Sequence, residues 1–217
     1  MTKETISRVT YALTRFGYLR VNRMNSKFPL GSAVLSLRYL LPASLTVRQI
    51  ARSSMMEQAD HIRDSVSLGM RDQPNVAYLE SSRSSTPPSL PADIGLSYPI
   101  VRIAVGRARL AALHAERREA LLNEIAVKSV DIWATFRERV LRSIDHFQER
   151  GFCASYGDLG REVHAVAVPI KPSPDGEIFV FNCGMPSYLL KEGQLEGNVR
   201  LRLVSMVRGV EGAMGMF

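Results

Sequence analysis

The side chains best suited to nucleophilic or metal chemistry in this 217-residue chain are two cysteines and four histidines. Cys153 and Cys183 lie far apart in the sequence, and the histidines at positions 61, 114, 146 and 164 lack the short spacings of metal ligands. These spacings do not exclude a Cys–His nucleophile pair, because its two residues need to be close in the folded structure and not in the sequence. Cys183 falls in an apolar run typical of a buried strand, which favours a packing role. We therefore predict no catalytic residue, no metal site, no cofactor and no enzymatic activity.

Glycines between positions 151 and 160 raise the alternative of a phosphate-binding loop. They neither follow a predicted strand nor open a predicted helix with phosphate-loop spacing. We interpret this segment as a flexible loop between a helix and the sheet.

Basic side chains are the second candidate for chemistry, and they are unevenly distributed. The chain has a net charge of +7, and its first 52 residues hold nine of the 28 basic residues but one of the 21 acidic ones. The first quarter thus carries +8, and the remainder carries −1. This asymmetry is typical of a polyanion-binding module joined to a neutral domain, although a solvated basic surface would give the same count.

A helix and a hairpin are predicted to position these basic residues. Thr2 is a suitable cap for a helix whose apolar residues recur at steps of three and four, the period of one buried face, and Gly17 ends it. Residues 18–21 and 27–30 then predict two short strands around a polar turn. A helix followed by a small basic hairpin is typical of the recognition helix and wing of a winged helix-turn-helix. The candidate DNA contacts are Thr2, Lys3, Thr5, Ser7 and Arg8 on the helix and Arg20, Arg23 and Lys27 on the wing.

The rest of the chain alternates helices and hairpin-connected strands. Residues 31–41 predict a short helix, and Ser44 is expected to cap a longer one whose stripe is Leu45, Ile50, Met55 or Met56, Ala59 and Ile62. Strands are expected at 65–70, 76–80, 163–170 and 178–183, helices at 105–114, 119–127, 133–147 and 191–207, and a mobile loop at 81–91. This order predicts an α+β fold with an antiparallel sheet.

Several of these segments resemble the IclR family of bacterial transcriptional regulators. The segments are 2–9, 13–19 and 27–31 near the N-terminus, the Pro99-Ile100 and Gly106-Arg107-Ala108 pieces, and the stretch from Gly151-Phe152 to Asn182-Cys183-Gly184-Met185-Pro186. By this resemblance we expect a winged helix-turn-helix that lacks the family's first helices. The resemblance implies a partial winged helix-turn-helix (1–41), a linker helix (42–64) and a GAF-like effector-binding domain with an antiparallel sheet (65–217).

The resemblance also implies where an effector would bind. The family's amide donors correspond to Ala104 and Val105, and its side-chain contacts to Ser155, Ala165, Asn182 and Gly184. Backbone amides do not depend on the side chain and are retained. At the other four positions, the residues of this chain differ from the polar side chains that hold small oxo-acids in the family. We therefore expect a larger aromatic or aliphatic carboxylate, contacted by Asn182 and Ser155.

Together these observations predict a ligand-responsive transcriptional regulator that binds operator DNA and a small organic effector as a homodimer or tetramer. The alternative is a stand-alone small-molecule sensor domain or a degenerate enzyme without DNA binding. No apolar stretch is long enough to span a bilayer and no secretory signal follows Met1, so a cytoplasmic protein without membrane association is expected.

Overall fold

A computed structural model describes residues 1–22, 24–34, 42–85, 94–170 and 176–216. The chain divides into two compact units, Met1–Thr46 and Val47–Phe217. Among the described residues, no helix is both long and apolar enough to cross a membrane.

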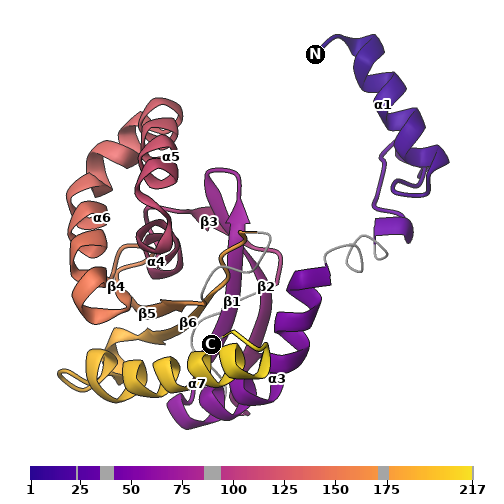
Figure 1. The fold of residues 1–217 in the computed structure, drawn as a ribbon. Helices are drawn as coiled ribbons and strands as arrows, with labels where there is room; N and C mark the ends of the chain where they lie inside the picture. The colour runs from indigo at the N-terminus through magenta and orange to yellow at the C-terminus, as the bar shows by residue number, and fades with distance from the viewer. Residues whose placement is uncertain (23, 35–41, 86–93, 171–175, 217) are drawn as a thin grey trace. The chain divides into compact units, whose positions relative to one another are not determined.

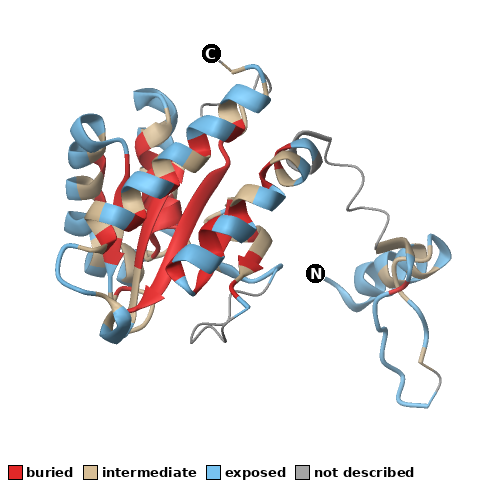
Figure 2. Ribbon diagram, turned by 90° about the horizontal axis from the view of Figure 1, so that it is seen from below, coloured by how far each residue is buried: buried red, intermediate tan, exposed pale blue. Residues whose placement is uncertain are grey.

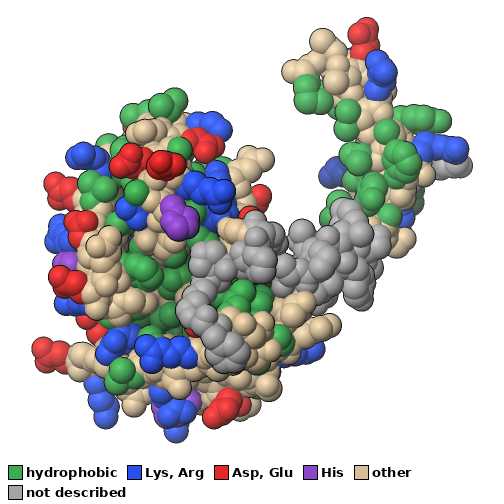
Figure 3. All heavy atoms as spheres, viewed as in Figure 1, with side chains coloured by type: hydrophobic (Ala, Val, Ile, Leu, Met, Phe, Trp, Pro, Cys, Tyr) green, Lys and Arg blue, Asp and Glu red, His purple; other side chains and the backbone are tan. Residues whose placement is uncertain are grey.

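The first unit begins with helix α1 (Lys3–Arg15), as predicted. The side-chain oxygen of Thr2 accepts a hydrogen bond from the Thr5 backbone N–H, and Gly17 leaves the helix with φ of +77°. The expectation of a buried helix face is wrong, because no residue of α1 is buried and its apolar side chains lie open along the helix (Figure 3). In the described part of this unit, no helix or strand packs over the apolar face of α1.

The predicted hairpin follows α1 and is held by few hydrogen bonds. Isolated antiparallel bridges join Leu19 to Leu30 and Asn22 to Lys27, in place of two regular strands. The side chain of Asn22 accepts a hydrogen bond from the Met24 N–H and tightens the turn. Arg23 and most of the predicted 31–41 helix lie outside the described residues.

The second unit is built on a six-stranded antiparallel sheet with the order β3-β2-β1-β6-β5-β4. Its strands are β1 (Ser65–Asp72), β2 (Asn75–Arg83), β3 (Ser97–Pro99), β4 (Cys153–Tyr156), β5 (Val163–Pro169) and β6 (Val180–Pro186). The predicted α+β class with an antiparallel sheet is confirmed. The two hairpins expected from sequence, β1–β2 and β5–β6, form the centre of the sheet.

Helices cover both faces of this sheet (Figures 1 and 2). The helices are α3 (Pro42–Ile62), α4 (Ala104–Ala112), α5 (Ala115–Lys128), α6 (Val130–Arg150) and α7 (Arg200–Ala213), the last preceded by a 3-10 turn (Ser187–Leu189) and a π-helical turn (Leu195–Val199). α3 and α7 lie on one face, and α4, α5 and α6 lie on the other. Ala167 and Val180 pack with the α4–α6 layer, whereas alternate residues such as Phe181 point to the opposite face.

The structure corrects several predicted boundaries. α3 begins at Pro42, two residues before the expected Ser44 cap, because the fixed φ of proline suits the first turn of a helix. In the described part of its stripe, Met55 is buried and Met56 is exposed, and Val47 and Ala51 take the inward positions rather than Ile50.

The segment interpreted as a flexible loop contains strand β4. Its Cys-Ala-Ser-Tyr sequence lacks β-branched residues and carries no strand period, but pairing with β5 supplies the hydrogen bonds. β3 was likewise not predicted, and its three residues pair with the start of β2.

Candidate functional site

A cavity of about 200 Å³ lies between the sheet and the N-terminus of α4. Small and aromatic side chains line it, and among the described residues none of the lining side chains carries a formal charge. The lining residues are Ser65, Ser67, Tyr78, Tyr98, Ile103, Ala104, Val105, Ser155, Leu159, Val163, Ala165, Asn182 and Gly184.

The floor of the cavity is a row of short side chains that crosses four strands in register. Ser65 of β1 pairs with Gly184 of β6, Gly184 pairs with Ala165 of β5, and Ala165 pairs with Ser155 of β4. None of these residues has a side chain longer than two heavy atoms, so the helix layer above cannot fill the space. The cavity therefore follows directly from strand register.

The N-terminus of α4 forms the roof. Gly106 places this helix directly against the backbone at Ile100, where a Cβ on residue 106 would lie 1.9 Å from the Ile100 carbonyl oxygen. Ile103 provides no side-chain cap, so the first-turn N–H groups of Ala104 and Val105 have no partner within the helix. Free amides and the positive end of a helix dipole make this end of the cavity suited to an anion.

Two tyrosines and an asparagine form the polar wall. The rings of Tyr78 and Tyr98 meet edge to face, with centroids 5.9 Å apart. Burial raises the pKa of the Tyr78 phenol, proximity to Tyr98 adds to the rise, and a hydrogen bond from Asn182 opposes it. The Asn182 Oδ1 atom is buried and accepts no hydrogen bond from the described residues. An unpaired buried acceptor is costly, so a donor on a bound ligand would stabilise the site.

The structure brings all six residues expected from the resemblance around this cavity. Ala104 and Val105 lie in the roof, Ser155, Ala165 and Gly184 in the floor row, and Asn182 in the polar wall. Sequence reasoning missed the other lining residues. For Ser65 and Ser67 a signal was present, because two serines alternate with apolar residues at the start of a strand.

Neither cysteine is among the residues that line this cavity. Cys183 is on the opposite face of the sheet, where its Sγ atom accepts a 3.7 Å hydrogen bond from Gln58. Burial raises the pKa of both thiols to about 12. Both thiols are therefore protonated at neutral pH, and neither is poised as a nucleophile. Within the described ranges, no group of three or more histidine, cysteine or acidic side chains is arranged to hold a metal ion.

The predicted DNA contacts of the first unit are exposed. The hydroxyls of Thr2 and Thr5 lie 2.9 Å apart at the start of α1, and Lys3, Ser7 and Arg8 follow in its first two turns. Arg20 and Lys27 are exposed on the hairpin.

The chain matches the family model described as "Bacterial transcriptional regulator IclR C-terminal" over residues 41–178. It is 30% identical, over 98% of its own length and 77% of the relative's, to the HTH-type transcriptional regulator TsaQ1/TsaQ2 of Comamonas testosteroni. An IclR family transcriptional regulator from Brucella abortus has a similar structure, with a TM-score of 0.86, 32% identity, and coverage of 98% of this chain and 80% of that one. An IclR homologue from Microbacterium hydrocarbonoxydans, crystallised with 4-hydroxybenzoate, shares the fold at a TM-score of 0.76 and 21% identity, covering 100% and 88% of the two chains.

Proposed function

Because this chain belongs to the IclR family of bacterial transcriptional regulators, we propose that it is a ligand-responsive regulator that binds operator DNA and a small organic carboxylate. The cavity between α4 and the sheet is the effector site. The observation that carries this assignment is the convergence of the unpartnered Asn182 Oδ1 and the uncapped α4 N-terminus on one cavity.

The lining favours a ligand with one negative charge and an apolar body. The backbone N–H groups of Ala104 and Val105 would donate hydrogen bonds to one carboxylate. The described lining contains no lysine or arginine that would balance a second negative charge. The Tyr78 and Tyr98 rings, with Ile103 and Leu159, would enclose a ring or a short branched chain. A ligand hydroxyl would satisfy Asn182 Oδ1. 4-Hydroxybenzoate, the ligand of the Microbacterium homologue, combines these three features.

The first unit would supply the DNA contacts. Thr2, Lys3, Thr5, Ser7 and Arg8 would meet the major groove, with Arg20, Arg23 and Lys27 on the phosphates. Residues 42–64 would join this module to the effector domain, and a homodimer or tetramer would place two modules on successive grooves. Effector binding would act through this linker by favouring one arrangement of the modules.

The effector assignment is tested by titrating 4-hydroxybenzoate into wild-type protein and an Asn182→Leu variant. Leucine keeps the approximate volume but removes the amide, so we expect affinity to fall about tenfold or more while the unfolding temperature stays near wild type. Asn123→Leu, at an exposed position on α5, is the matched control and should bind as wild type. Equal affinity in all three proteins would refute the site.

DNA binding is tested with a duplex of the intergenic region upstream of the chain's own gene. Arg8→Glu should abolish binding, whereas Arg208→Glu, which makes the same charge change on the exposed side of α7, should not. Affinity should fall steeply with salt, by about 0.9 logarithmic units per neutralised phosphate for each tenfold rise in salt concentration. Absence of salt-dependent binding in the wild type would favour the alternative, a sensor domain that does not bind DNA.

A further inference from the structure

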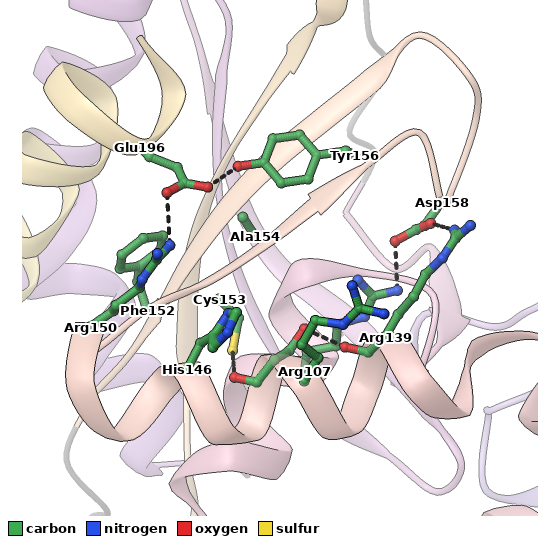
Figure 4. Close-up of a pocket in the computed structure, with 12 residues that line it drawn as sticks. Arg107, Arg139, His146, Arg150, Phe152, Cys153, Ala154, Tyr156, Asp158 and Glu196 are labelled. Atoms are coloured by element: carbon green, nitrogen blue, oxygen red, sulfur yellow. Dashed lines mark hydrogen bonds and ion pairs between the residues drawn. The ribbon is translucent and has the colours of Figure 1, made fainter. Parts of the chain in front are cut away.

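A second hollow, of about 440 Å³, lies beside α6, β4 and the π-helical turn before α7 (Figure 4). It shares no lining residue with the proposed effector cavity. Strand β4 contributes to both sites: Ser155 lines the effector cavity, and its neighbours Ala154 and Tyr156 line the second hollow.

One face of α6 supplies a row of nitrogen-bearing side chains to this hollow. Arg139, Arg142, His146 and Arg150 follow one another at steps of three, four and four residues, which places them on a single helical face. Arg107 enters from α4, and its side chain is 3% exposed. Phe152, Cys153 and Ala154 add an apolar part to the lining.

Carboxylates at the two ends of the hollow neutralise part of this positive charge. Asp158 pairs with Arg107 and Arg139 at one end, and Glu196 pairs with Arg150 and Tyr156 at the other (Figure 4). Between them, Arg142 and His146 have no hydrogen-bond or ion-pair partner among the residues that the structure describes. The lining therefore holds four arginines against two carboxylates, with its unused donors at the centre.

We propose that this hollow binds a phosphate dianion, either as free phosphate or as the head of a phosphorylated small molecule. The planar guanidinium group of Arg142 offers paired N–H donors that match two phosphate oxygens, and the imidazole of His146 offers a third donor one turn away. The excess of two arginines over carboxylates matches the charge of the ligand. An uncharged or monoanionic aromatic ligand is disfavoured here, because it would leave these donors unpaired. The site is independent of the effector cavity and does not require DNA binding.

The test is calorimetric titration of the full chain with inorganic phosphate at constant ionic strength. We expect saturable binding with one site per chain. A double variant, Arg142→Gln with His146→Gln, should lose about tenfold or more in affinity, because it removes the Arg142 charge, the paired guanidinium donors and the His146 imidazole donor. Both residues are exposed, so folding should be retained, and circular dichroism checks this. Arg137→Gln, which removes one charge from α6 without touching the hollow, should bind phosphate as wild type.

Two outcomes would overturn the proposal: no saturable phosphate binding by the wild type, or equal phosphate affinity in the wild type and the double variant. A parallel titration with glycerol phosphate separates the two sources of the dianion. Tighter binding of glycerol phosphate than of inorganic phosphate supports a phosphorylated small molecule as the ligand, and weaker binding supports the free ion.

Discussion

Arg107 and Asp158 form an ion pair at 2.6 Å between Nη2 and Oδ2, with each side chain only 3% exposed. The pair joins α4, which carries the roof of the effector cavity, to the loop that follows β4. Arg107 also donates from Nε to the Val101 carbonyl. Burial lowers the pKa of the Arg107 guanidinium, and the Asp158 carboxylate opposes that change. The Asp158 carboxylate therefore stabilises the buried positive charge of Arg107.

Replacing Asp158 with asparagine should destabilise the protein by about 3–5 kcal/mol, because it leaves a buried guanidinium without a countercharge. Urea unfolding followed by circular dichroism measures this loss. Arg139→Gln removes the other partner of Asp158, but that side chain is 57% exposed, so its loss should cost less than about 1 kcal/mol. Combining Asp158→Leu with Arg107→Met should restore much of the stability. A double variant as unstable as Asp158→Asn would contradict the explanation.

Gly106→Ala should destabilise the protein and weaken 4-hydroxybenzoate binding together. The new Cβ would overlap the Ile100 carbonyl, so α4 must shift away from the backbone on which it rests. We expect a cost of about 1–3 kcal/mol, typical of overpacking. Gly209→Ala is the matched control in α7, where no heavy atom lies within 4 Å of the new Cβ, and it should be neutral or stabilising by up to about 1 kcal/mol. Differential scanning calorimetry compares the two, and equal unfolding temperatures would count against this role of Gly106.

Both cysteines should resist alkylation in the folded protein. Cys183 is fully buried, Cys153 is 2% exposed, and burial raises the pKa of each thiol from 9.0 to about 12. Iodoacetamide at pH 8 should label neither in buffer and both in urea, as read by mass spectrometry.

The same thiols should lower stability at high pH. In the folded chain they keep their protons up to about pH 12, whereas in the unfolded chain they lose them above about pH 9. The unfolded state thus binds fewer protons in this window, and the free energy of unfolding falls as pH rises from about 9 to about 12. A Cys153→Ala, Cys183→Ala variant should show a shallower decline. An identical pH profile would show that the thiols do not contribute.

Arg102 should support the effector site without touching it. Its guanidinium donates to the backbone carbonyls of Asp158 and Leu159, each at 3.1 Å, and Leu159 lines the effector cavity. Arg102→Met removes both hydrogen bonds, so the loop loses its anchor and 4-hydroxybenzoate affinity should fall by about threefold to tenfold. Arg117→Met, on the exposed side of α5, is the control for titration calorimetry. Because this prediction rests on the proposed effector, unchanged affinity in Arg102→Met alongside a loss in Asn182→Leu would refute only the role of Arg102.

Local sequence pattern was sufficient for the elements that carry a strong period. The helix expected at 133–147 corresponds to α6, whose inward face includes Trp133, Phe136, Val140, Ile144 and Phe147, fully or partly buried. β1, β2, β5 and β6 were predicted from apolar runs flanked by turns. β4 was missed because four residues without β-branching form a strand only through their pairing with β5.

The cavity required information that no local pattern contains. Ser65 and Gly184 become neighbours only when β1 pairs with β6, and the order of the sheet is set by long-range packing. The family resemblance identified positions in β4, β5, β6 and α4 but none in β1 or β2. Tyr78, the residue whose ring and hydroxyl shape the polar wall, was therefore not predicted.

The register of β6 limits how this protein can diversify. Asn182 and Gly184 face the cavity, whereas Phe181 and Cys183 are buried on the other side of the strand. An insertion or deletion of one codon within β6 would exchange these two sets, filling the cavity with bulky apolar groups and placing an amide in the opposite core. New ligand preferences are thus accessible by point substitution in β6, while changes in chain length are confined to the connections between strands.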